Sequence, residues 1–357
     1  MRKHLRPLLV AAAAVAMVPA SAQAAGKTVI AGPPEEPASA PEGGDVNAFY
    51  PKKIKVAKGD TVSFEIRGFH DVYFPGRGKR APGLVSPDSP IAGVDDAAGQ
   101  PFWFNGQPRL IVTPALMGPA GDAEVDGGRA ADGSGLPLDD GPPPPYEVEF
   151  TKKGSFSYFC NVHDGMKGKV TVLNKRKRVP STSRDAAKAK KQFAKDLATL
   201  KRNDRFDGPS GANVQVGNDT KRTAFFRFFP GTQTATVGEP VKFNFAGTSG
   251  EIHNIAVGPK DYLDAQAEGI FAPDMSTTPP ALVLNPIIFY PSDPPNAFPA
   301  WSPALHGNGF INTGALDTVG ATPQPSQATI AFSQPGTYSY YCLIHYPDMA
   351  GTIDVTG

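Results

Sequence analysis

Cysteine is almost absent from this sequence, in which only Cys160 and Cys342 occur among 357 residues. Small exported domains that depend on disulfides carry many more cysteines, so a disulfide framework is excluded. A single bond between these two residues is a possible alternative, but it would join loops in separate halves of the chain. Each cysteine instead stands in a short segment that also contains a histidine and a methionine, which favours metal binding.

Long hydrophobic runs are also missing. A helix that spans a bilayer needs about 20 apolar residues, and the run Leu8–Val18 is shorter than that. It follows a basic start and precedes the small-x-small segment Ala22–Ala24, which together form the pattern of a secretory signal over residues 1–24. We therefore expect an exported protein that is extracellular, periplasmic or held in the cell envelope. We do not expect it to span a membrane or bind nucleic acid.

Helical periodicity is scarce. Gly and Pro number 38 each, a composition that favours loops and β-structure. Apolar residues alternate with polar neighbours, which is the period of a half-buried strand. The first such positions are Ile54, Val56, Val62, Phe64 and Ile66. The length of the chain suggests two domains.

A strong net charge is lacking, because the whole chain totals only +1. Residues 175–205 depart from this balance, with twelve Lys and Arg against three Asp. Apolar residues in this segment fall at helical spacing, so we expect a basic amphipathic helix between two acidic domains. The helix either lies on the domains and fixes their spacing, or docks on an anionic partner such as a lipid or a cell-wall polymer.

The second half of the sequence repeats the first. Residues 154–160 read GSFSYFC, and residues 336–342 read GTYSYYC. A histidine stands about 90 positions before the cysteine in each copy, at His70 and at His253. Chance does not preserve such an interval together with matched segments, so we infer a tandem duplication.

Each copy places a thiol, an imidazole and a thioether in one short loop. The spacing is Cys-x2-His-x2-Met in the first copy and Cys-x2-His-x3-Met in the second. With a second histidine, these groups form the ligand set of a mononuclear copper site that passes one electron at a time. A β-sandwich would hold such ligands rigidly, so that little rearrangement accompanies each electron transfer.

These motifs resemble those of the cupredoxins, the family of plastocyanin and amicyanin, present twice in one chain. The resemblance covers about 45–75 and 145–174 in the first copy, and about 226–258 and 327–357 in the second. It implies an all-β fold of two Greek-key β-sandwich domains, joined here by a short basic α-helical linker.

The resemblance also implies two mononuclear type 1 (blue) copper sites in each chain. The implied ligands are His70, Cys160, His163 and Met166 for one copper, and His253, Cys342, His345 and Met349 for the other. His163 and His345, expected on exposed loops, would be the points of electron exit. The implied function is single-electron transport by a carrier that is not an enzyme, with redox proteins as unidentified partners.

One position beside a ligand departs from the family. Asn254 follows His253, as in plastocyanins, whereas Asp71 follows His70. The departure leaves open whether the hydrogen bond that this asparagine makes in the family is present in the first copy.

The expected organisation follows from these assignments. It comprises a signal peptide over 1–24, a flexible leader over 25–44, a first domain over 45–174 with an insertion at about 76–145, a helical linker over 175–212, and a second domain over 213–357 with an insertion at about 259–326. We assign Trp103 and Trp301 to the insertions. They would form either a small satellite core or a docking surface that covers the copper loops.

Histidine is scarce as well, with 6 in the chain. His4 lies in the signal, four are assigned as ligands, and only His306 remains. Laccase-type and nitrite-reductase copper clusters need more histidines than this, so an enzyme would require a cross-subunit copper site at His306. The other alternative is copper storage or delivery. Proteins of that class display many Met, Cys or His, whereas this chain has 6 Met.

Overall fold

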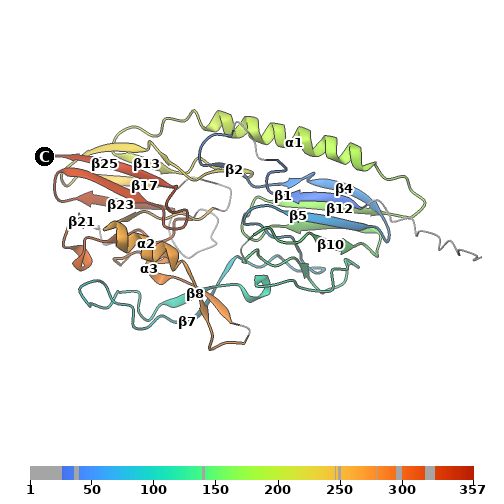
Figure 1. Cartoon of the computed structure of the whole chain (residues 1–357), viewed down its shortest axis with the longest axis horizontal. Helices are drawn as coiled ribbons and strands as arrows, with labels where there is room; N and C mark the ends of the chain where they lie inside the picture. The colour runs from blue at the N-terminus through green and yellow to red at the C-terminus, as the bar shows by residue number, and fades with distance from the viewer. Residues whose placement is uncertain are drawn as a thin grey trace, which may run out of the picture.

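The computed structural model describes residues 26–35, 40–138, 141–245, 247, 251–278, 280–294, 300–317 and 326–357. Two β-sandwiches lie side by side, and one long helix runs across both (Figure 1). The prediction of an all-β protein with two sandwich domains and a helical linker is confirmed. The expected signal peptide over 1–24 lies outside the described residues. Among those residues, no helix combines the length and apolar character needed to cross a membrane.

The first sandwich consists of sheets with strand orders β10-β5-β1-β3 and β4-β12-β11-β6-β9. Their bounds are β1 (Lys27–Ala31), β3 (Phe49–Tyr50), β4 (Lys53–Ala57), β5 (Thr61–Ile66), β6 (Tyr73–Phe74), β9 (Asp132–Gly133), β10 (Tyr146–Glu149), β11 (Gly154–Phe159) and β12 (Lys167–Leu173). Val62, Phe64 and Ile66 are buried in β5 while their neighbours are partly exposed, as the alternating pattern predicted.

Strand β1 lies where the sequence predicted a flexible leader, over 25–44. It pairs in parallel with β5 and antiparallel with β3, and both Val29 and Ala31 are fully buried. The leader prediction is therefore wrong for this strand. The Pro- and Gly-rich residues that follow give the region the composition of a linker, and a five-residue strand offers few positions for an alternating pattern.

The second sandwich has the orders β15-β13-β17-β23-β21 and β16-β25-β24-β18-β22. Its strands are β13 (Asn213–Val216), β15 (Phe228–Phe229), β16 (Thr232–Thr236), β17 (Pro240–Asn244), β18 (Ala256–Val257), β21 (Ala300–Trp301), β22 (Ile311–Asn312), β23 (Gln327–Phe332), β24 (Gly336–Tyr341) and β25 (Ala350–Thr356). Its parallel pairs, β13/β17 and β16/β25, correspond to β1/β5 and β4/β12 of the first sandwich. The two halves therefore share one pattern of strand pairing.

Helix α1 (Thr182–Asn203) forms where the sequence predicted it. The Ser181 side chain caps its start by accepting a hydrogen bond from the Arg184 amide. Its buried residues Ala189, Phe193 and Leu200 recur at helical spacing. They share one core with residues of both sandwiches, including Val46, Tyr50, Phe225 and Phe229. The helix thus lies on both domains, and most of its Lys and Arg side chains are exposed.

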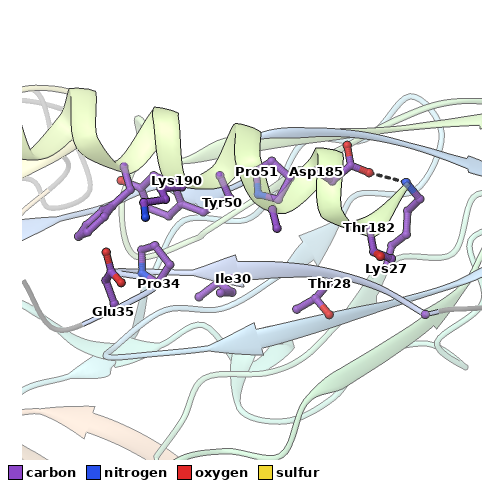
Figure 2. Close-up of a pocket in the computed structure, with 14 residues that line it drawn as sticks. Lys27, Thr28, Ile30, Pro34, Glu35, Tyr50, Pro51, Thr182, Asp185 and Lys190 are labelled. Atoms are coloured by element: carbon purple, nitrogen blue, oxygen red, sulfur yellow. Dashed lines mark hydrogen bonds and ion pairs between the residues drawn. The ribbon is translucent and has the colours of Figure 1, made fainter. Parts of the chain in front are cut away.

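Polar contacts hold α1 in place. Figure 2 shows Lys27 of β1 directed toward Asp185 in the first turn of the helix, beside a cavity of about 320 Å³. Farther along, Asp196 accepts a hydrogen bond from the Tyr50 hydroxyl (3.0 Å) and pairs with Arg222 (2.8 Å). Strand β2 (Gly44–Val46) pairs with β14 (Thr223–Phe225) below the helix, which adds a backbone connection between the halves.

The two insertions fold together. Strands β7 (Val85–Pro90) and β8 (Pro108–Val112) of the first insertion form one sheet with β19 (Phe271–Asp274) and β20 (Ala281–Leu284) of the second. The remaining helical segments are η1 (Pro114–Leu116), α2 (Lys260–Glu268), α3 (Pro286–Phe289) and η2 (Leu305–Gly307). In Figure 1 this sheet lies below the sandwiches, on the side away from α1.

The tryptophans belong to different cores. Trp103 packs against the core of the insertions, and its Nε1–H donates to the Pro291 carbonyl (2.7 Å). Trp301 lies instead in the core of the second sandwich, so its assignment to the insertion core is wrong. The insertion core also contains Leu343, the residue after Cys342, so it is a satellite core that packs against the segment following β24.

Candidate metal centres

The first site is assembled at the ends of strands. His70 follows β5, Cys160 follows β11, and Met166 immediately precedes β12. The Cys160 amide donates to the Met166 carbonyl (3.0 Å), and the Met166 amide donates to the His163 carbonyl (2.8 Å). These bonds close the loop between two antiparallel strands, so Cys160 and His163 stand next to each other.

The donor atoms of the first site form a small triangle. Cys160 Sγ lies 3.8 Å from Nδ1 of His70 and 3.5 Å from Nδ1 of His163, and the two nitrogens are 2.9 Å apart. A point equidistant from all three lies about 2 Å from each, close to the length of a metal–nitrogen bond. Met166 is buried in the same core as Cys160. The residues present therefore fit one metal ion.

The second site repeats this geometry. Cys342 Sγ lies 3.8 Å from Nδ1 of His253 and 3.5 Å from Nδ1 of His345, and the nitrogens are 3.1 Å apart. The Cys342 amide donates to the Met349 carbonyl (3.0 Å), and Met349 is fully buried. Both cysteines are free thiols with their own histidines, so the alternative of a disulfide between them is wrong.

Asp71 and Asn254 make the same hydrogen bond behind the two sites. Asp71 Oδ1 accepts from the Asn161 amide (2.6 Å), and Asn254 Oδ1 accepts from the Leu343 amide (2.7 Å). The hydrogen bond that the sequence left open is thus present in the first site. The second oxygen of Asp71 is buried and has no hydrogen-bond partner among the described residues.

The two thiols differ in their electrostatic surroundings. Burial raises the pKa of Cys160, and the Asp71 carboxylate raises it further. Burial also opposes ionisation of Cys342, but the imidazoles of His345 and His253 outweigh it and lower the pKa of that thiol to about 5. The protein alone thus favours the thiolate more strongly in the second site.

The upstream histidines also have different surroundings. His70 lies against Gly32, whose φ is +92°, and a Cβ there would fall 2.3 Å from the Arg67 carbonyl oxygen and 3.1 Å from His70 Nε2. His253 Nε2 lies 4.0 Å from an oxygen of Asp219 instead. Burial lowers the pKa of His70. At His253 the nearby carboxylate and thiol outweigh burial and raise the pKa to about 10.

The two loop histidines meet at the boundary between the sandwiches. His163 Nε2 lies 3.0 Å from Oε1 of Glu251, and His345 Nε2 lies 3.7 Å from Oε2 of the same side chain. His163 is only 5% exposed, and His345 is half-buried. The expectation that both histidines lie on exposed loops is therefore wrong, because the other sandwich and the insertions cover them.

Glu251 is the site residue that the sequence did not reveal. It stands two positions before His253, where the first copy has Gly68. Because the repeat carries no matching acid, nothing in the pattern distinguished Glu251 from a surface carboxylate. Only the packing of one half on the other brings it to both loops.

Imidazoles of both sites line one cavity of about 400 Å³. Most of its other lining residues are apolar, and half of them come from the insertions, among them Leu84, Val85, Val112, Phe271, Leu284 and Phe289. The unassigned histidine lies elsewhere, because His306 Nδ1 is 3.3 Å from Asp96 and its Nε2 is 3.7 Å from Asp293. His306 therefore links the two insertions.

No model of a known protein family matches the sequence, and no curated protein matches it. Solved structures similar to part of the chain include a mutant plastocyanin of fern, with 19% identity, 40% of this chain and 99% of that chain covered, and a TM-score of 0.21. Auracyanin from Roseiflexus castenholzii has 17% identity, coverage of 42% and 100%, and a TM-score of 0.24. A purple cupredoxin from Nitrosopumilus maritimus has 14% identity, coverage of 41% and 100%, and a TM-score of 0.22.

Proposed function

We propose that this chain binds two copper ions at type 1 sites and transfers single electrons. The observation that carries the proposal is the buried triangle of one Sγ and two Nδ1 atoms, which recurs with nearly equal edges in both sandwiches. Sulfur and imidazole ligands of this kind suit copper, which supplies a one-electron couple when bound.

The protein's own residues would supply the ligands and hold them in place. Cys160 and Cys342 each offer a thiolate, and two histidines at each site offer Nδ1 lone pairs. Met166 and Met349 are buried next to the loops and would offer a weak thioether contact. The ligands lie at strand ends in packed cores, which limits their movement when an electron arrives or leaves.

Copper storage or delivery is the first alternative. It is disfavoured because seven of the eight donors are buried and the eighth, His345, is only partly exposed, whereas release to a partner calls for accessible ligands. An enzyme that uses a cross-subunit copper at His306 is the second alternative. The positions of Asp96 and Asp293 disfavour it, since each ring nitrogen of His306 already faces a carboxylate of the same chain, at 3.3 Å and 3.7 Å.

We also propose that the chain arose by tandem duplication and is exported to the periplasm, the cell envelope or the extracellular space. The matched strand pairing of the two sandwiches supports duplication. The signal-like start of the sequence supports export. Redox proteins would be the electron partners, and the exposed basic face of α1 offers a surface for an anionic one.

Copper loading of the full chain tests the function. We expect two copper ions per chain and an intense blue absorption band, and we expect Cys160→Ser to remove about half of that band. Cys342→Ser should remove the other half, and the double variant should be colourless. Unchanged colour in Cys160→Ser would exclude a blue site in the first sandwich. A third, colourless copper that depends on His306 in an oligomer would favour the enzyme.

A further inference from the structure

Glu251 is buried at the boundary between the two sandwiches. The chain places it between β17 and β18 of the second sandwich, and it is only 6% exposed. Its two carboxylate oxygens lie on different histidines, with Oε1 on His163 at 3.0 Å and Oε2 on His345 at 3.7 Å. One side chain thus contacts both candidate centres.

The ring geometry fixes which groups donate. Nδ1 of His163 and Nδ1 of His345 both face a cysteine sulfur, at 3.5 Å in each site. A histidine that offers Nδ1 to a metal carries its hydrogen on Nε2. Nε2–H of His163 therefore lies within hydrogen-bonding distance of the carboxylate, and Nε2–H of His345 faces it at a longer 3.7 Å. A carboxylate beside a metal-binding histidine orients the ring and makes it a stronger donor. Here one carboxylate would do this for two histidines.

The first sandwich helps to hold this carboxylate. Asn47 Nδ2 donates to Glu251 Oε1 at 2.7 Å, and this contact is buried. On the other side, the Phe226 ring stacks on His345 with centroids 4.4 Å apart. Glu251 therefore belongs to the second sandwich by sequence and is fixed by the first through a hydrogen bond. Its position depends on the two halves staying together.

We propose that Glu251 is a positioning residue shared by both centres, and that it lowers the reduction potential of each. This inference rests on the proposed function. A carboxylate beside the ligand imidazoles stabilises the more positively charged, oxidised state of each site. No covalent bond forms or breaks, because one electron arrives from or leaves to an external redox partner. The two sites are therefore tuned together by one side chain.

The test uses full-length single-site proteins loaded with copper. Cys342→Ser retains the first centre and Cys160→Ser retains the second, and each is combined with Glu251→Gln. Redox titration of the remaining blue band should give a higher midpoint potential in both combinations. The shift should be larger at the first centre, where the contact is 3.0 Å rather than 3.7 Å.

Two further variants separate the role of Glu251 from a general change of charge. Glu147→Gln removes one exposed carboxylate from β10 and should leave both potentials unchanged. Glu251→Asp keeps the charge but shortens the side chain, so it should give smaller shifts than Glu251→Gln.

The outcomes are distinct. If Glu251→Gln raises the midpoint potential in only one of the single-site proteins, the shared role is overturned. The same holds if it raises the potential in neither protein while the blue band persists. If adding Glu251→Gln removes the blue band from both single-site proteins, this supports the shared role. If it removes the band from only one of them, this contradicts the shared role. If the single-site proteins with Glu251 intact show no blue band, the proposed function itself fails.

Discussion

Asp71 and Asn254 occupy matching positions beside the two centres but differ in charge. Each accepts an amide hydrogen bond from the ligand loop, at 2.6 Å and 2.7 Å. Asp71 therefore makes the same accepting contact as the asparagine and adds a buried carboxylate, whereas the Asn254 side chain also donates to Asn312 and Ile288. We expect the charge of Asp71 to lower the reduction potential of the first centre.

Asp71→Asn should raise the reduction potential of the first centre. Two unit charges a few ångströms apart interact by about 2–4 kcal/mol at an effective dielectric constant of about 20, and each ~2.3 kcal/mol corresponds to about 0.1 V for one electron. Redox titration at pH 8 in the Cys342→Ser background measures the shift. Asn254→Asp in the Cys160→Ser background is the reciprocal variant and should lower the potential. Equal reduction potentials for parent and variant would show that the Asp71 carboxylate has no electrostatic effect on the first centre.

At the residue scale, the sequence predicted the candidate donor residues of both sites but not the residues that surround them. The matched spacing of His70 and Cys160, and of His253 and Cys342, identified donors that the structure brings within 3.8 Å. Their binding of copper stays a prediction. The burial of His163 and its contact with Glu251 could not be read from the sequence, because they depend on how one half packs on the other.

Helix α1 joins the sandwiches through its apolar face. Phe193 lies in a core with Tyr50 of the first sandwich and Phe229 of the second, and its ring is 5.6 Å from that of Tyr50. Its exposed face carries the basic residues that the sequence indicated. The packing of α1 on both domains therefore stabilises their relative arrangement.

Phe193→Ala should destabilise the protein by about 3–5 kcal/mol, because truncating a buried Phe removes apolar contacts and leaves a cavity. The free energy of unfolding from chemical denaturation measures this loss. Lys191→Ala, on the exposed face of the same helix, should change it by less than about 0.5 kcal/mol. Similar values for the two variants would mean that α1 packs only loosely.

Elements with strong periodic patterns were predicted, and those without them were not. The spacing of Ala189, Phe193 and Leu200 indicated α1, and the alternation in β5 indicated a strand. β1 was missed because it is short and lies next to Pro- and Gly-rich residues. The sheet of β7, β8, β19 and β20 was missed because its strands come from two insertions, and no local pattern reveals pairing over such a distance.

The whole molecule is organised around the boundary between its halves. Helix α1 lies on one side, the shared sheet of the insertions lies on the other, and the two candidate centres face each other between them. The sequence predicted two domains with separate electron exits. The structure instead gives both sites one carboxylate and one cavity, because the insertions and α1 hold the two sandwiches together.

His306 tests how far the insertions contribute to this arrangement. It belongs to the second insertion and contacts Asp96 of the first at 3.3 Å, with Asp293 at 3.7 Å from its other nitrogen. The nearby carboxylate of Asp293 raises the pKa of His306 despite partial burial, and Asp96 adds to this effect. The imidazole of His306 therefore binds its proton more tightly in the folded protein than in the unfolded chain.

The sign of the pH dependence follows from this raised pKa. The contribution of His306 to stability is fully present below its unfolded pKa of about 6.5, and it is lost as the pH rises through the higher folded pKa. The difference in unfolding free energy between the parent and His306→Gln should therefore be largest at about pH 6 and shrink toward alkaline pH. Chemical denaturation of both proteins across this range measures it, and the parent-minus-variant difference cancels the titration of shared groups. A difference that grows with pH would mean that His306 is neutral in the folded protein, so that its contacts with the two aspartates are not ion pairs.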